Sequence, residues 1–333
     1  MARKMTQETG KDPSEVRVDN HNNWPFVELF DCEKEFLARM AQKNIQQIFV
    51  TAKLSPNKDD EPFNSAVGHI LDCLDSLPRR PDAGFDCIYK TIDNFLGAFP
   101  PSEKSPLHNA VNTLFHSNQD AWSEITSILM ANFPQQSADY AATRILECHV
   151  DKQLPHAEEI KRRARRSIES DRYEEFLDKY LITNPQMPGE YFLKNDGERN
   201  AGRLFRMMMR LEGPLELEED KTPEVFPAGN KLNFYDSASV IENQVKMNIL
   251  MEVLVYTYRN ERFHGDTFSP FRSGKAKMKT YAHAYFMLIS SYIFLLGILE
   301  FKGMGGLNIS DVVNVARSSM DSFSRFFEDH VNK

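Results

Sequence analysis

Apolar residues recur at intervals of three and four along most of the chain, which is the spacing of helices that bury one face. Phe85, Ile88, Ile92 and Phe95 are a clear example. No stretch alternates polar and apolar residues for long enough to predict a sheet. We therefore expect an all-α fold, built as a bundle of helices. In chain order the predicted helices cover about 26–48 (with an interruption), 66–77, 85–96, 106–117, 120–132, 137–149, 155–182, 237–260, 275–302 and 309–330.

The helical pattern divides the chain into four parts. Residues 1–23 are polar and of mixed charge, so we expect a flexible tail without a signal sequence. Helices fill 24–184, the N-terminal helical region. The next part, 185–235, is rich in proline and glycine and includes an acidic run at 215–223, which predicts a loop-rich linker or insertion. Strong helices resume over 236–333.

Composition narrows the class of protein. Hydrophobic residues make up 41% and charged residues 26% of the chain, the balance of a globular protein. The formal charge is −8, so any binding of nucleic acid would come from a local basic patch. The cysteines form no CxxC pair, and no ligand set recurs at metal spacing. We therefore expect reduced thiols, no metal, no cofactor and a cytoplasmic location. The cysteines are Cys32, Cys73, Cys87 and Cys148.

One apolar segment bears on membranes. The nineteen residues from Tyr281 to Leu299 carry no formal charge, which just reaches the length of a transmembrane helix. The segment also contains His283, two serines and three tyrosines. A helix that is apolar on all sides at the centre of a globular core has the same pattern, and we favour that interpretation. A membrane-acting effector that inserts this segment is the alternative.

Candidate chemistry lies at the end of the helix predicted from Ser237 to about Tyr258. This helix is too apolar for the surface, and it is followed at once by Arg259-Asn260-Glu261-Arg262-Phe263-His264. Histidine titrates near neutrality and can exchange protons with a ribose 2′-hydroxyl or a leaving 5′-oxygen. Arginine stays charged and can stabilise a phosphate as negative charge develops. Together they suffice for cleavage of RNA without a metal.

The spacing of this pair sets a geometric condition. Residues five apart in an ideal helix point roughly 140° away from each other. Arg259 and His264 therefore converge only if the helix ends between them, with Gly265 as its stop, or if a second subunit completes the site. Spacing alone is weak evidence, because the chain holds three such pairs, and only the middle one has asparagine after arginine. The pairs are Arg144/His149, Arg259/His264 and Arg325/His330.

The segment from Tyr258 to Gly265 resembles the signature of the HEPN superfamily, in which arginine, a polar residue and then histidine stand on a helix of an all-α domain. The helix from Phe85 to Leu96 is similar to an early helix of that fold, whose acidic or polar residues face the motif. The resemblance covers 250–302 and, more loosely, 60–130. It implies a metal-independent endoribonuclease, usually a dimer with a composite cleft, as in several toxin and phage-defence proteins.

The resemblance also implies roles for individual residues. Arg259 and His264 would be catalytic, and Asn260 would support them. Asp86 or Asp93 would be the partner of the arginine, with Arg262 as a further supporting residue.

Two basic clusters are candidates for contact with RNA. One follows the motif, where a local excess of positive charge would suit a phosphate-binding cleft. The other lies on one face of a predicted helix, where the alternative is ion pairing with Glu198, Glu212 or the acidic run. The run from Lys161 to Arg166 is also basic, and we interpret it as a solvated surface, with RNA contact as the alternative. The candidate RNA-binding residues are Arg272, Lys275, Lys277 and Lys279, and Arg199, Arg203, Arg206 and Arg210.

Three functions follow as hypotheses. The first is a metal-independent ribonuclease in which His264 is general acid or base and Arg259 stabilises the phosphorane, leaving 2′,3′-cyclic phosphate ends. Its expected partners are RNA, a second copy of the chain and a cognate antitoxin or other regulatory protein, with no membrane. The second is a helical scaffold that binds nucleic acid or a partner protein without turnover. The third is the membrane-acting defence effector.

Overall fold

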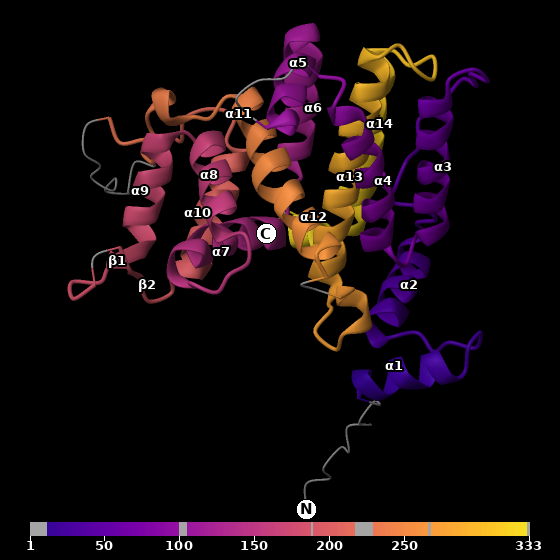
Figure 1. Cartoon of the computed structure of the whole chain (residues 1–333), viewed down its shortest axis with the longest axis horizontal. Helices are drawn as coiled ribbons and strands as arrows, with labels where there is room; N and C mark the ends of the chain where they lie inside the picture. The colour runs from indigo at the N-terminus through magenta and orange to yellow at the C-terminus, as the bar shows by residue number, and fades with distance from the viewer. Residues whose placement is uncertain (1–11, 100–104, 188, 217–228, 266–267, 332–333) are drawn as a thin grey trace, which may run out of the picture.

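The computed structural model describes residues 12–99, 105–187, 189–216, 229–265 and 268–331. Helices account for nearly all of its regular structure (Figure 1), which confirms the predicted all-α class. The helices are α1 Pro13–Asn22, α2 Asp31–Lys43, α3 Glu61–Ser76, α4 Pro81–Leu96, α5 Pro106–Ser117, α6 Gln119–Ala131, α7 Gln135–Val150, α8 Ala157–Ile168, α9 Ser170–Tyr180, α10 Gly197–Arg210, α11 Asn243–Asn248, α12 Tyr256–Phe263, α13 Met278–Phe301, α14 Ile309–Phe326 and α15 Glu328–Val331.

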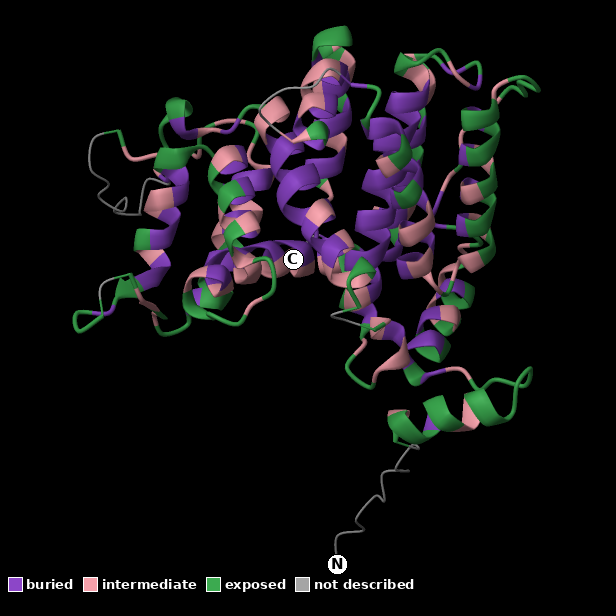
Figure 2. Cartoon of the chain, in the orientation of Figure 1, coloured by how far each residue is buried: buried purple, intermediate pink, exposed green. Residues whose placement is uncertain are grey.

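Helix α13 forms the centre of the molecule. Apart from Lys279, Thr280 and its last two residues, Glu300 and Phe301, every residue of this helix is buried (Figure 2). It packs against α2, α4, α5, α7 and α14, which come from both the N-terminal and the C-terminal parts of the chain. By length and composition α13 could cross a membrane, but 89% of its most apolar window is buried within the protein. A single helix of this kind is weak evidence for a membrane span, because the core helix of a globular protein has the same composition.

A second buried helix carries the motif. It runs without a break through α11, a π-helical stretch at Ile249–Val255, and α12. It begins at Asn243, later than predicted, because Ser237–Ser239 form a separate 3₁₀ turn. All seven residues of the π-helical stretch are buried, including the single charged residue Glu252. Such stretches widen the helix locally and are frequent at functional sites.

The prediction of one continuous helix over 155–182 is wrong, because two helices, α8 and α9, cover this range. The backbone of Glu169 has a positive φ of 72°, which ends α8 and separates it from α9. After α9 the chain forms a small antiparallel hairpin of β1, Leu181–Thr183, and β2, Tyr191–Leu193. Strands of three residues are too short to show an alternating pattern, so the hydrophobic periodicity did not predict them.

The helices before and after the expected linker share one hydrophobic core, which extends from Val16 to Val331. The expected flexible tail is helical from Pro13, and Arg17 donates a hydrogen bond to the carbonyl of Arg272, 2.8 Å away. Part of the expected linker is also ordered, because α10 lies within it and packs closely on α7. Residues 217–223 of the acidic run lie outside the described residues.

Candidate functional site

The motif arginine lies at the interface between α12 and α4. Arg259 forms an ion pair with Asp93, with 2.8 Å between Nη2 and Oδ2. Its Nη1 donates to Oδ1 of Asn260 at 3.0 Å, and the guanidinium lies 4.8 Å from the centroid of the Phe263 ring. The expected contact between Arg259 and an acidic residue of the 85–96 helix is therefore present, through Asp93. Asn260 orients the arginine, as its position next to it in the sequence indicated.

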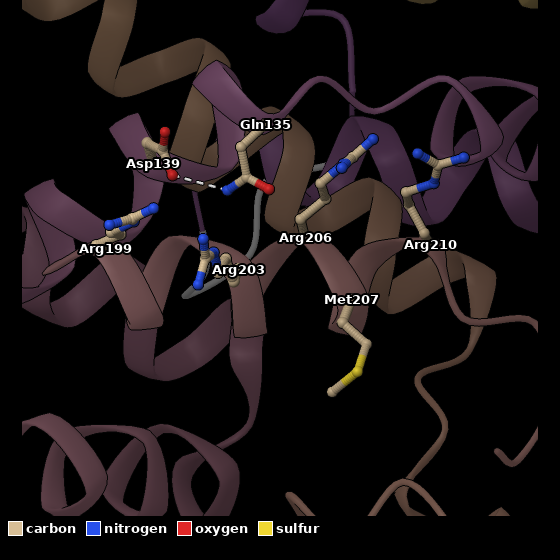
Figure 3. Close-up of a pocket in the computed structure, with 7 residues that line it drawn as sticks. All are labelled: Gln135, Asp139, Arg199, Arg203, Arg206, Met207 and Arg210. Atoms are coloured by element: carbon tan, nitrogen blue, oxygen red, sulfur yellow. Dashed lines mark hydrogen bonds between the residues drawn. The ribbon is translucent and has the colours of Figure 1, made fainter. Parts of the chain in front are cut away.

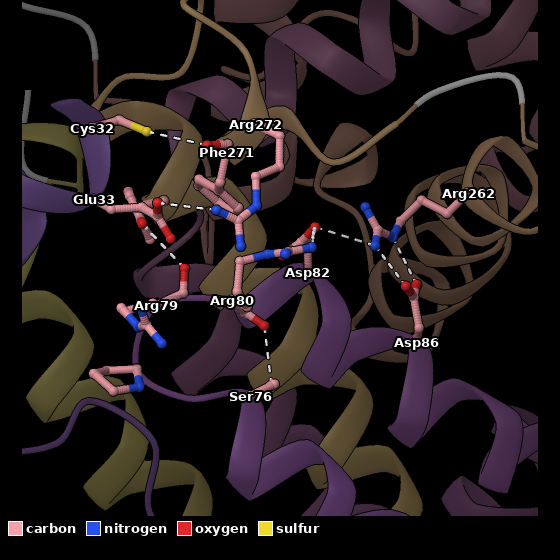
Figure 4. A network of polar contacts seen from close by, with 12 residues as sticks. Cys32, Glu33, Ser76, Arg79, Arg80, Asp82, Asp86, Arg262, Phe271 and Arg272 are labelled. Atoms are coloured by element: carbon pink, nitrogen blue, oxygen red, sulfur yellow. Dashed lines mark hydrogen bonds and ion pairs between the residues drawn. The ribbon is translucent and has the colours of Figure 1, made fainter. Parts of the chain in front are cut away.

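Arg262, the second arginine of the motif, forms ion pairs that hold two helices together (Figure 4). Its guanidinium binds both carboxylate oxygens of Asp86, at 2.7 and 2.5 Å, and reaches Asp82 at 3.3 Å. Arg80 also pairs with Asp82, at 2.9 Å. Burial lowers the pKa of Arg262, but the hydrogen bonds and charge of Asp86, with Tyr258 and Asp82 nearby, raise it above the ordinary value overall. Asp86 thus joins α12 to α4 through Arg262, and it is not the partner of Arg259.

His264 is exposed at the end of α12, where Gly265 takes a positive φ of 76°. It is not among the residues that line the cavity beside Arg259, so within one chain the two groups do not share that cavity. Its neighbour is His156, which precedes α8 and is also exposed. The centroids of the two imidazole rings are 4.8 Å apart. The structure therefore places His264 beside a second histidine, His156, which the sequence did not indicate as a site residue.

Arg259 lines a cavity of about 340 Å³ between α4, α5, α8 and the π-helical stretch. At its wall Glu252 is fully buried and accepts hydrogen bonds from Ser167 at 2.8 Å, from Ser105 and from Arg166, and it lies 3.1 Å from Nδ1 of His108. Burial raises the pKa of Glu252, but these hydrogen bonds lower it more, to about 2. The network fixes a charged carboxylate beside the cavity. The cavity is lined by Asp93, Leu96, Gly97, Ser105, Pro106, Leu107, Glu159, Arg162, Arg163, Arg166, Glu252, Tyr256 and Arg259.

The basic run on α8 supplies much of this cavity, so the interpretation of the whole run as a solvated surface was wrong. Arg162, Arg163 and Arg166 line the cavity, and Arg163 is only 3% exposed. Arg165 and Lys161 fit that interpretation, because each forms an ion pair with a glutamate at the surface. The repeat of arginines at 162, 163 and 166 places one face of α8 against the cavity.

The basic residues after the motif divide into two groups. Arg272 lies 3.4 Å from the buried carboxylate of Glu33 and stacks over the Phe30 ring at 5.4 Å, which fixes the loop before α13 to α2 (Figure 4). Lys275 and Lys277, which precede α13, and Lys279 in its first turn have exposed side chains. Contact of these residues with RNA stays a prediction.

The predicted arginine stripe of α10 lines an open groove of about 610 Å³ (Figure 3). Arg199, Arg203, Arg206 and Arg210 share it with Gln135, Asp139 and Met207. The expected ion pairs with Glu198 and Glu212 do not form. Instead Arg206 and Arg210 donate to the carbonyl of Val331, the latter at 2.7 Å. Within the described part of the chain, Arg199 and Arg203 have no acidic partner.

Gly202 allows α10 to approach the opposite wall of this groove. A Cβ atom at Gly202 would lie less than 3.0 Å from the side chain of Asp139 on α7. Asp139 in turn accepts a hydrogen bond from Gln135 at 2.7 Å. The close packing of α7 on α10 therefore positions Asp139, the one carboxylate among the described residues that line this groove with the four arginines.

Two further histidines form side-chain contacts within the protein. His283 on the central helix is hydrogen-bonded to Ser137 at 3.0 Å, and burial lowers its pKa to about 4. His149 contacts the hydroxyl of Tyr173 at 2.7 Å. Among the described residues no group of three or more His, Cys, Asp or Glu side chains is arranged to hold a metal ion.

Comparison of the chain with family models, curated proteins and solved structures gives no match. The site must therefore be interpreted from its own geometry.

Proposed function

We propose that the protein binds RNA, with the phosphate backbone seated in the α10 groove. The observation that carries this proposal is the groove itself, in which four arginines face one carboxylate among the described lining residues. Arg199 and Arg203 are exposed and have no acidic partner among the described residues, so their charges are available to a ligand. A guanidinium matches the geometry of a phosphate because it offers parallel donors.

The groove also suits a chain of phosphates better than a single anion. Its arginines are four, three and four residues apart, so they follow α10 over about 16 Å at 1.5 Å per residue. The net charge of the whole protein is −8, and binding of a polyanion depends on such a local concentration of positive charge. Binding should therefore depend strongly on salt, since each phosphate contact releases a counterion.

Replacing Arg199 and Arg203 together by glutamine is expected to weaken the binding of single-stranded RNA. The slope of log K against log salt should fall in magnitude by about 1.4, because each lost contact removes about 0.7 for single strands. The test is fluorescence anisotropy with a labelled oligoribonucleotide in EDTA. The KCl concentration is varied between about 50 and 200 mM, the range over which such slopes are measured. The matched control is Arg325→Gln, an exposed arginine on α14.

An unchanged affinity and slope in the Arg199→Gln/Arg203→Gln variant would exclude the groove as the RNA site. A loss in Arg325→Gln that is half that of the double variant, and therefore equal for each charge removed, would show that only the total charge matters.

A second candidate function, metal-independent cleavage of RNA, is favoured by one observation. His264 and His156 present two imidazoles 4.8 Å apart at the surface, and a pair of histidines can supply both the acid and the base of the reaction. Arg259 is paired with Asp93 in the cavity, so a reaction that uses the two histidines involves no contact between Arg259 and the reacting phosphate. A second copy of the chain is the other way to bring an arginine to His264.

Under this second function, His264→Ala and His156→Ala should each reduce the rate of cleavage about 10²- to 10⁴-fold, the usual contribution of a general acid or base. The assay is incubation of the purified protein with total RNA in EDTA, with detection of 2′,3′-cyclic phosphate ends. His116→Ala is the control, because His116 is an exposed histidine on α5. Absence of cleavage by the wild type, together with salt-dependent binding, would leave RNA binding as the function.

A further inference from the structure

We propose that the cavity beside Glu252 is a second site, separate from the α10 groove, which binds the phosphate group of a small molecule. Arg162, Arg163 and Arg259 would hold the phosphate. The cavity lies between α4, α5 and α8, whereas the groove lies between α7 and α10.

The strongest evidence is an incompletely bonded guanidinium inside the protein. Arg163 is 3% exposed and lies 4.3 Å above the ring of Tyr256. Its Nη1 is 2.5 Å from Glu159, but Nε and Nη2 have no hydrogen-bond partner among the described residues. Nε of Arg259, a residue that lines the same cavity, likewise has none in the described part of the chain. A buried donor without an acceptor costs about 1–3 kcal/mol, so these groups indicate a ligand that accepts hydrogen bonds.

The charges around the cavity favour an anion. Its three carboxylates are each engaged by an arginine: Asp93 by Arg259, Glu159 by Arg163, and Glu252 by Arg166. Arg162, exposed at the edge of the cavity, is the fourth arginine and has no acidic partner among the described residues. One positive charge is therefore left over, and Arg163 and Arg259 line the same cavity.

The size of the cavity and its lining select the class of ligand. A volume of about 340 Å³ is near the lower end for small-molecule sites, so it suits a small molecule and not a polymer. Arginine pairs with phosphate through parallel donors. Leu96, Pro106 and Leu107 give the cavity an apolar wall that would contact the organic part of a phosphomonoester.

The site is tested by isothermal titration calorimetry and by thermal unfolding of the full chain. The probes are inorganic phosphate and glycerol 3-phosphate, and KCl at equal ionic strength is the reference. Both probes should bind and raise Tm with saturation, whereas KCl should not. Tighter binding of glycerol 3-phosphate would identify a phosphomonoester as the ligand, and equal or weaker binding would identify inorganic phosphate.

Three variants locate the binding. Arg162→Gln should raise Kd about tenfold through the loss of one charge-assisted contact. Glu159→Gln should lower Kd, because it removes the carboxylate that competes for Arg163. Arg199→Gln/Arg203→Gln should leave Kd unchanged, which separates this site from the groove. Since neither Arg162 nor Glu159 is buried, both variants should fold.

The proposal is overturned if the wild type shows no binding beyond the KCl reference. It is also overturned if Arg162→Gln and Glu159→Gln bind both probes as the wild type does. A purely structural role for Arg163 predicts that Glu159→Gln lowers Tm without any gain in phosphate affinity.

Discussion

Replacing Glu252 by glutamine is expected to lower the free energy of unfolding at pH 7 by about 3 kcal/mol. The carboxylate is fully buried, and its folded-state pKa of about 2 lies well below the ordinary 4.5. Each pKa unit corresponds to about 1.4 kcal/mol of preference for the charged form in the folded protein. Glutamine cannot form the charged pairs, so the half-buried guanidinium of Arg166 would be left beside a neutral group. Urea unfolding at pH 7 measures the change.

The difference between wild type and Glu252→Gln should depend on pH. Because the folded pKa is depressed, this contribution is fully present above pH 4.5 and is lost as the pH falls towards 2. The two proteins should therefore converge in stability as the solution is acidified through this range. Glu158→Gln is the control, because Glu158 is an exposed residue of α8 paired with Lys161, and it should unfold like the wild type. A constant difference at all pH values would contradict the assignment of the charged form.

Gly297→Ala is expected to destabilise the protein by about 2 kcal/mol. A Cβ atom at Gly297 would lie less than 3.0 Å from two atoms of the Trp122 indole, which is itself 1% exposed. Overpacking of a core costs about 1–3 kcal/mol, which exceeds the gain of up to about 1 kcal/mol from replacing a helical glycine by alanine. Thermal or urea unfolding measures the effect.

The matched control for that gain is Gly68→Ala. Gly68 is exposed in the middle of α3, and no atom lies within 4 Å of where its Cβ would be. The same substitution should therefore stabilise the protein there, by up to about 1 kcal/mol. Opposite signs at the two glycines would show that α6 and α13 are in close contact. Stabilisation at both positions would contradict this packing.

Much of the fold could be predicted because helices repeat a local pattern. The helix predicted at 106–117 matches α5, and 120–132 differs from α6 by one residue at each end. Prediction failed where the backbone departed from that pattern for a local reason. Glu169 takes a left-handed conformation inside a sequence that suits a helix, and only the surrounding structure decides this.

The candidate site was predicted less completely, because its partners are distant in the sequence. The resemblance led to Asp93 as a partner of Arg259, 166 residues away. His156, Arg163 and the residues around Glu252 were missed. One signal was available for Glu252, because it is a single carboxylate within the apolar run from Ile249 to Val255. A lone charge in such a run must be paired when the helix is buried.

The burial of α13 has a consequence for the order in which the chain is made. Four of the helices that contact it, α2, α4, α5 and α7, are synthesised earlier, and they share no completed core until Met278–Phe301 has emerged. The last contacting helix, α14, follows α13 in the chain. Until α13 has been synthesised, the apolar faces of the earlier helices that pack against it are exposed. Proteins in this state are prone to aggregate and to recruit chaperones. A fragment that stops before α13 would be held in that state permanently.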